Sequence, residues 1–177
     1  MKAALSTAML LFLLLPVLYC AGLRWNPTPS VPKGIYRIAA GVPTRGDLVA
    51  FCLEGEWVVL ARERGYLGPG NCSSGLRPLL KRLAGLPGDA LTVTAEEISI
   101  VPPAGQVHRW QAPVRRSDAQ GRPLPESALR SGVIPAGMGM ALAGHAGSFD
   151  SRFFGLIPLA SMVRVEPVFT FKIRRTS

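Results

Sequence analysis

The chain has 177 residues and a mass of 18.9 kDa, which suits one domain with or without a membrane anchor. Hydrophobic residues make up 48% of it and charged residues 18%, a balance too apolar for a disordered chain. The net charge is +9, but the basic residues are scattered, so nucleic acid is not expected as a partner; a basic face toward solvent or toward an anionic lipid surface explains them.

An uncharged segment runs from Ala3 to Leu23. As a helix it would span roughly 30 Å, the thickness of a bilayer core, which predicts a transmembrane anchor over residues 1–24. The competing interpretation is a cleaved signal peptide, but the run exceeds the ~7–15 apolar residues of such a peptide. With either interpretation, residues 25–177 form a domain that is carried across a membrane.

After this segment, short apolar runs alternate with turn residues, a pattern that predicts an antiparallel, mainly β domain with two sheets or a barrel-like sheet. The proline-rich stretch Asn26–Gly34 is expected to be an extended loop, and Trp57–Ala61 to pair as a hairpin with the strand before it. Residues 102–132 are interpreted as a polar excursion that carries little core, and Gly144–Gly155 as a polar loop. The predicted strands are Ile35–Ile38, Leu48–Leu53, Trp57–Ala61, Ala90–Thr94, Glu97–Val101, Met138–Ala143 and Met162–Phe171.

Three cysteines are present, and Cys20 lies in the apolar segment. Cys52 and Cys72 are close enough in sequence to bridge, and a disulfide fits an exported domain in an oxidising compartment. A metal site is not expected, because His108 and His145 have no ligand spacing to the cysteines. No cofactor is predicted.

The candidate base is Lys81, which lies in an apolar stretch. Burial disfavours the charged form of a lysine, and a neutral amine is what a general base for a serine needs. The alternative is that Lys81 and Arg82 end a short element and extend to water. A second option, a Ser–His–Asp triad of Ser148, His145 and Asp150, is a minor one because all three lie in one loop.

The candidate nucleophile is Ser30, which lies between Pro29 and Pro32. Its own N–H and the Thr28 hydroxyl could form an oxyanion hole, the pair of donors that stabilises a tetrahedral intermediate. The plainer alternative is an ordinary polar loop just outside the membrane.

Taken together, three segments resemble the sequence boxes of type I signal peptidases, in the same order. They are Thr-Pro-Ser-Val-Pro-Lys-Gly-Ile-Tyr (28–36), Lys-Arg-Leu-Ala-Gly-Leu-Pro-Gly-Asp (81–89) and Ser-Phe-Asp-Ser-Arg-Phe-Phe-Gly (148–155). Gly46–Asp47 matches another box. Residues 118–125 and the cysteine pair are similar to the conjugative-transfer branch of that family, the TraF type.

This resemblance implies a signal-peptidase-like serine endopeptidase, held in the inner membrane by one span, with its catalytic domain in the periplasm. It would cut an exported precursor after small residues, a conjugative pilin subunit in the closest branch, and some relatives also cyclise the pilin. The alternative is a general type I signal peptidase. The implied partners are a membrane-held precursor, the lipid bilayer and proteins of the conjugation apparatus.

The resemblance also implies a role for each site residue. Ser30 would be the nucleophile and Lys81 the general base, with Thr28 and the Ser30 N–H in the oxyanion hole. Ser148 would orient the lysine amine. Asp150 and Arg152 would hold the wall of the site as an ion pair. The substrate is expected to lie extended against a strand edge, either the stretch beside Ser30 or Met140–Ala143.

Two other classes compete with this interpretation. One is an anchored basic domain without enzymatic activity, but the aromatic residues that it would expose are expected to be buried. The other is an autoprotease of the SOS-repressor type, which has the same dyad but is cytoplasmic and has no apolar anchor.

Overall fold

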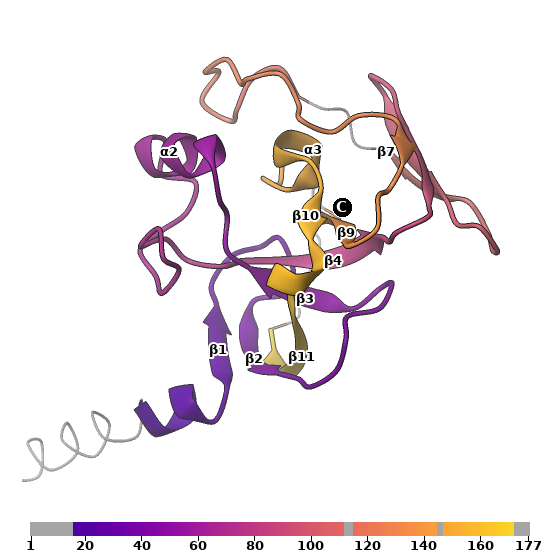
Figure 1. Ribbon diagram of the computed structural model, residues 1–177. Helices are drawn as coiled ribbons and strands as arrows, with labels where there is room; N and C mark the ends of the chain where they lie inside the picture. Colours follow the sequence, from indigo (N-terminus) through magenta and orange to yellow (C-terminus); the bar gives the residue numbers. More distant parts are fainter. Residues whose placement is uncertain (1–15, 112–114, 145–146, 172–177) are drawn as a thin grey trace, which may run out of the picture.

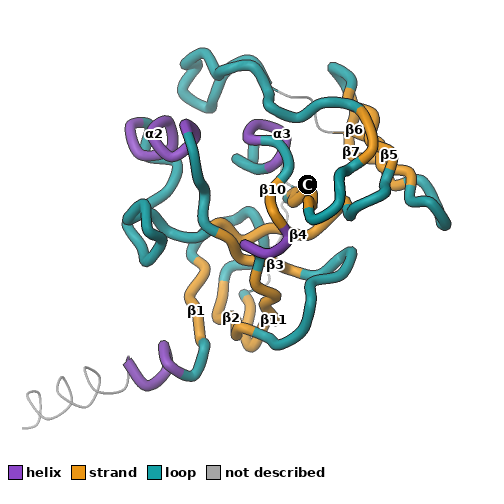
Figure 2. The backbone as a smooth tube through the Cα atoms, in the orientation of Figure 1, coloured by secondary structure: helices purple, strands orange, loops and turns teal. Residues whose placement is uncertain are grey.

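The computed structural model describes residues 16–111, 115–144 and 147–171. Within these residues, short strands form a seven-stranded sheet with the order β1-β2-β11-β3-β4-β9-β10 and a four-stranded sheet with the order β7-β6-β5-β8. All the strand pairs are antiparallel. The prediction of a mainly β domain with two sheets is confirmed, and Figure 2 shows how much of the remaining chain is loop.

The elements follow one another along the chain as Figure 1 labels them. They are β1 (Leu23–Asn26), β2 (Gly34–Ile38), β3 (Leu48–Phe51), α2 (Glu56–Glu63), β4 (Leu79–Gly85), β5 (Ala90–Val93), β6 (Glu97–Val101), β7 (His108–Gln111), β8 (Gly132–Val133), β9 (Met138–Leu142), α3 (Ser151–Phe154), β10 (Ile157–Pro158), the 3-10 turn η1 (Leu159–Ser161) and β11 (Val163–Thr170).

Two of the three hydrophobic clusters among the described residues hold the helices and the small sheet against the large sheet. The larger cluster packs α2 and α3 against β3 and β4, and Figure 1 shows both helices on one side of the large sheet. The second cluster joins the two sheets: Ala84, Met140 and Leu142 from the large sheet contact Leu91 and Ile98 from the small one. The large sheet is therefore packed on both sides of β4, the strand that carries Lys81.

One strand prediction was wrong. Trp57–Ala61 lies in helix α2, not in a strand paired with β3. Trp57 and Ala61 are four residues apart, so a helix places both on one face, where both are buried in the larger cluster. A short apolar run is compatible with the repeat of a helix and with that of a strand. Here, contact of Trp57 and Ala61 with the core favours the helix.

The segment 102–132 was expected to carry little core, and this expectation was wrong. Residues 102–132 contain β7 and bury Leu129 in the second cluster, so this segment contributes to the core.

The N-terminal segment contains a strand that was not predicted. Strand β1 begins at Leu23 and pairs with β2. Most of the predicted anchor lies outside the described residues, and within the described ones no helix is long and apolar enough to cross a membrane.

The predicted disulfide between Cys52 and Cys72 is present, with the Cα atoms 5.6 Å apart. It joins the end of β3 to the loop between α2 and β4. The bond spans 20 residues of sequence, and the chain-entropy relation gives about 3 kcal/mol for a loop of that size. It therefore stabilises the segment that leads into β4.

We predict that Cys52→Ala with Cys72→Ala lowers the free energy of unfolding by about 3 kcal/mol, because the unfolded chain gains the freedom that the crosslink removed. Urea unfolding in detergent measures this. Cys20→Ser is the matched control, because Cys20 is an exposed free thiol. Equal stability of the double variant and the native protein would contradict the prediction.

Candidate active site

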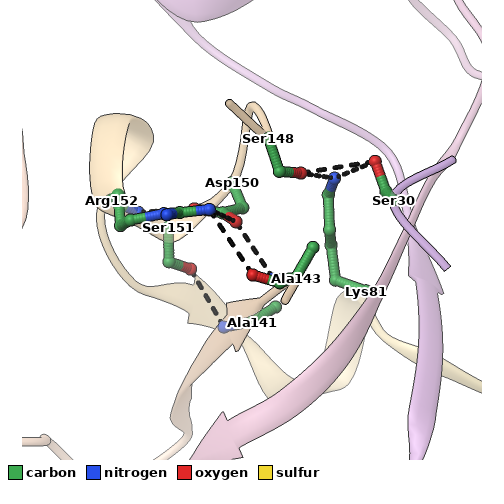
Figure 3. A network of polar contacts seen from close by, with 8 residues as sticks. All are labelled: Ser30, Lys81, Ala141, Ala143, Ser148, Asp150, Ser151 and Arg152. Carbon is green, nitrogen blue, oxygen red and sulfur yellow. Dashed lines mark hydrogen bonds and ion pairs between the residues drawn. The ribbon is translucent and has the colours of Figure 1, made fainter. Parts of the chain in front are cut away.

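Three segments that are distant in sequence meet at one point of the large sheet. Ser30 comes from the loop between β1 and β2, Lys81 from β4, and Ser148 from the loop after β9 (Figure 3). Lys81 Nζ lies 3.0 Å from Ser30 Oγ and 2.6 Å from Ser148 Oγ, and the two hydroxyl oxygens are 3.3 Å apart. The amine is therefore within hydrogen-bond distance of both hydroxyls.

Strand alternation explains why Lys81 points inward. In β4 the side chains at 79, 81 and 83 are buried while Arg82 is exposed, as expected for successive residues on opposite faces. Lys81 is opposite Val49 in the neighbouring strand β3, and its exposed fraction is only 2%. Of the two alternatives for Lys81, the buried one is confirmed.

Burial alters the chemistry of the Lys81 amine. Desolvation lowers the pKa of Lys81 to about 8, with the positive charge of Arg152 acting in the same direction and the negative charge of Asp150 opposing it. A substantial share of the amine is therefore neutral at mildly alkaline pH. A neutral amine has one lone pair that can accept the Ser30 proton and N–H groups that can donate to Ser148.

An ion pair supports the loop that carries Ser148. Arg152 Nη2 and Nε donate to the two carboxylate oxygens of Asp150 at 2.7 and 2.8 Å, and both side chains are fully buried. Asp150 also accepts from the Ala143 N–H, and Ser151 Oγ accepts from the Ala141 N–H (Figure 3). These contacts join α3 to β9 and fix where the chain passes Lys81.

The same contacts correct one expectation about the substrate. The edge Met140–Ala143 was a candidate for pairing with an extended peptide. The N–H groups of Ala141 and Ala143 already donate to Ser151 and Asp150, so this edge is occupied by the chain itself. The other candidate edge is the stretch beside Ser30, where β1 is the outermost strand of the sheet.

The loop around Ser30 contains contacts that were not predicted. The Thr28 hydroxyl donates to Asn26 Oδ1 at 2.7 Å, and so does the Thr28 N–H at 3.2 Å. The Ser30 N–H has no acceptor among the residues that the structure describes. The Asn-Pro pair at 26–27 was a usable signal, because asparagine commonly accepts from the N–H two residues on.

Asp89, at the end of the segment 81–89, has a structural role in the turn after β4. It is buried, accepts from Arg45 Nη2 at 2.7 Å and from the Leu86 N–H, and so fixes the turn after β4. Asp118 accepts from Tyr66 and Arg122, which ties the turn 118–122 to the loop after α2. The hydrogen bonds of the Lys81 amine go to Ser30 and Ser148, and not to either of these carboxylates.

A cleft of about 1050 Å³ passes over the dyad. Its lining includes Ser30, Lys81 and Ser148 together with the loop around Asp118 and the start of β1. Its volume is at the upper end of the range for ligand-binding clefts. His145, the base of the alternative triad, lies outside the described residues.

Comparison with known proteins identifies the family. The family described as "Signal peptidase, peptidase S26" matches residues 1–169. The chain belongs to this signal peptidase family. It is therefore a serine peptidase, as the resemblance implied, and the segments that carried the resemblance form the site described above.

Two relatives are named for conjugation. The "Conjugal transfer protein TraF" of Agrobacterium tumefaciens (strain 15955) is 36% identical over 159 residues, covering 85% of this chain and 84% of the relative. The "Plasmid transfer protein TraF" of Escherichia coli is 33% identical over 156 residues, covering 86% and 85%. A crystal structure of a signal peptidase I from Enterococcus faecalis V583 has 21% identity and a TM-score of 0.35, covering 75% of this chain and all of that one.

We predict that Asp150→Asn lowers the free energy of unfolding by about 3–5 kcal/mol, because it removes the negative charge that is paired with the buried Arg152 guanidinium. Glu126→Gln is the matched control: its ion pair with Arg130 is exposed, and its loss costs less than about 1 kcal/mol. Urea unfolding of both variants measures the difference. If Asp150→Asn lowers the free energy of unfolding as little as Glu126→Gln does, the buried pair has no structural role.

We further predict that Lys81→Met raises the free energy of unfolding at pH 7 by about 1–4 kcal/mol, because an apolar side chain avoids the cost of burying a charge. The pKa of Lys81 is about 8 in the native protein and about 10.5 in the unfolded chain. The unfolded state binds more protons between these values, so native stability rises with pH there and the advantage of the variant shrinks.

Urea unfolding in detergent at pH 7 and pH 9.5 measures both effects. Lys33→Met is the control, because the Lys33 side chain is exposed. A Lys81→Met advantage that is absent at pH 7, or that does not shrink by pH 9.5, would contradict the buried-charge explanation.

Proposed function

We propose that this chain is a membrane-anchored serine endopeptidase that processes an exported precursor, a conjugative pilin subunit, after small residues. The proposal places it in the inner membrane with one span, and its catalytic domain in the periplasm. The observation that carries it is the buried Lys81 amine 3.0 Å from Ser30 Oγ, in a chain of the signal peptidase family. The conjugative substrate is supported by the relatives named as transfer proteins.

In the proposed mechanism, Ser30 Oγ attacks the scissile carbonyl carbon while its proton passes to the neutral Lys81 amine. Ser148 Oγ holds the amine from the other side, at 2.6 Å, so that its lone pair faces Ser30. When the C–N bond breaks, Lys81 gives the proton to the leaving amine, and the new N-terminus departs. An acyl ester on Ser30 remains.

Two donors are proposed for the oxyanion of the tetrahedral intermediate. The first is the Ser30 N–H, which donates to no acceptor among the residues described. The second is the Thr28 hydroxyl, whose proton points to Asn26 in the free protein and turns toward the oxygen as negative charge develops there. A hydroxyl hydrogen rotates freely enough for this role.

The acyl ester is then resolved by a second nucleophile. Water loses a proton to Lys81 and attacks the ester carbonyl, which releases a carboxylate and restores Ser30. If an amino group of the precursor itself takes the place of water, the same step forms an amide and closes the chain into a ring. The open, broad cleft over Ser30 accommodates either acceptor.

The wall of the cleft beside the nucleophile is apolar. Val31, next to Ser30, is buried against Tyr36 and Val165, and Leu48 and Leu80 pack around them. Tyr36, Leu80 and Val165 also line the cleft, so this wall offers apolar contact to a substrate side chain beside the cut.

Contact with the bilayer is supported by an exposed aromatic cluster. Trp25 in β1 and Phe169 and Phe171 at the end of β11 are each about half exposed, and Phe171 contacts both of the others edge to face. Aromatic side chains are favoured at the membrane–water interface. These residues lie next to the end of the predicted anchor, so the cluster would hold the site close to a substrate that is itself in the membrane.

We predict that Ser30→Ala and Lys81→Ala each abolish processing of the precursor, with a double variant no worse than either, because the two groups act as one unit. Co-expression with candidate pilins, followed by intact-mass measurement of the products, tests this and shows whether the product is linear or cyclic. Lys33→Ala is the matched lysine control. Native-like cleavage by Lys81→Ala would contradict the dyad, and cleavage of secreted precursors in place of pilins would favour a general signal peptidase.

A further inference from the structure

Asn26 lies at the end of β1, and its side chain is buried under the loop that carries Ser30. Its Nδ2 group donates to the carbonyl oxygens of Thr28, Val31 and Pro32 at 3.1, 3.4 and 3.2 Å. Its Oδ1 atom accepts from the N–H and the hydroxyl of Thr28. One side chain thus makes five hydrogen bonds to residues on both sides of Ser30, in which the two Nδ2 hydrogens are shared among three carbonyl oxygens.

The composition of this loop makes such a partner necessary. Pro27, Pro29 and Pro32 have no N–H group, so the loop cannot satisfy its own carbonyls by regular backbone pairing. Buried backbone carbonyls without a donor are costly. Asn26 supplies the donors, and Tyr36, whose hydroxyl donates to Pro32 O at 2.5 Å, supplies one more.

The far end of the loop is held by close backbone packing. Gly34 begins β2 beside β11, and a Cβ atom there would overlap the Phe169 carbonyl oxygen. The loop is therefore clamped where it enters β2. Between Asn26 and Gly34 it is held by the buried side chain of Val31 and by side-chain hydrogen bonds. Asn26 makes most of these.

We propose that Asn26 is the positioning residue of the nucleophile, which holds the Ser30 hydroxyl at its distance from Lys81 and keeps Thr28 beside it. The inference rests on the proposed function, in which Ser30 attacks the substrate. Asn26 does not touch the reacting atoms in this scheme. Its effect is therefore on the rate of attack, since misplacement by about 1 Å can cost about 100-fold in rate.

The test uses the full-length protein in detergent, with p-nitrophenyl acetate as an acyl donor. Release of p-nitrophenol gives the acylation rate. Intact mass, after subtraction of the acylation of Ser30→Ala, gives the fraction of protein acylated at Ser30. Asn26→Leu removes all five hydrogen bonds without adding charge. Asn26→Asp keeps an acceptor for Thr28 but cannot donate to the three carbonyls. Gln106→Glu makes the same amide-to-carboxylate change at an exposed position.

We expect both Asn26 variants to acylate about 10–100-fold more slowly than the native protein, while Gln106→Glu keeps the native rate. The fraction finally acylated should stay close to that of the native protein. The midpoint of the pH–rate profile of Asn26→Leu should stay near 8, where Lys81 titrates. A slower rate with an unchanged midpoint assigns the loss to the serine and not to the amine.

Two other outcomes would overturn the inference. If an Asn26 variant has the native rate constant but a smaller acylated fraction, Asn26 only stabilises the fold; if rate and fraction are both native, it has no role in positioning. The acylation rate constant is a property of the folded molecules alone. A preparation in which only part of the Asn26 variant is folded therefore still distinguishes slow acylation from loss of folded protein. Failure of the proposed function looks different: the native protein and Ser30→Ala would then be acylated alike.

Discussion

The burial of the Lys81 amine inside the large sheet is the constraint on which the site depends. A charged ammonium in an apolar core is expensive, and the sheet places it there because residue 81 is on the same face of β4 as Leu79 and Leu83. That cost is what lowers its pKa to about 8. The fold thus gives up stability at a single position and gains an amine that is partly neutral near physiological pH.

The surroundings of Lys81 limit this cost. Ser148 and Ser30 supply hydroxyl oxygens at hydrogen-bond distance from the amine, so the buried nitrogen is not left without partners. Asp150 and Arg152 carry opposite charges whose effects on Lys81 oppose each other. Because these two groups pair with each other, they hold the loop after β9 in place while leaving the amine unneutralised.

The serine side of the site is organised on a different principle. Lys81 is placed by a regular strand and by packing, whereas Ser30 lies in a loop whose prolines prevent regular pairing. Such a loop needs hydrogen bonds from outside its backbone, and Asn26 and Tyr36 provide them. The result is a nucleophile on a rigid loop at the edge of the sheet, open to the cleft and close to the exposed aromatic residues.

The sequence by itself determined the features that depend on local pattern and composition. Strand alternation and turn residues predicted the mainly β fold, the cysteine spacing predicted the disulfide, and the sequence indicated Ser30 and Lys81 as the candidate nucleophile and base. Only the tertiary structure decided whether Lys81 is buried or reaches solvent, that Trp57–Ala61 forms a helix, and that the Met140–Ala143 edge is occupied. The hydrogen bonds of Asn26 reach only residues 28–32, so this local feature was open to prediction and was missed. The other three features depend on contacts between segments far apart in the chain, and a local pattern of residues carries no information about which partner will lie opposite.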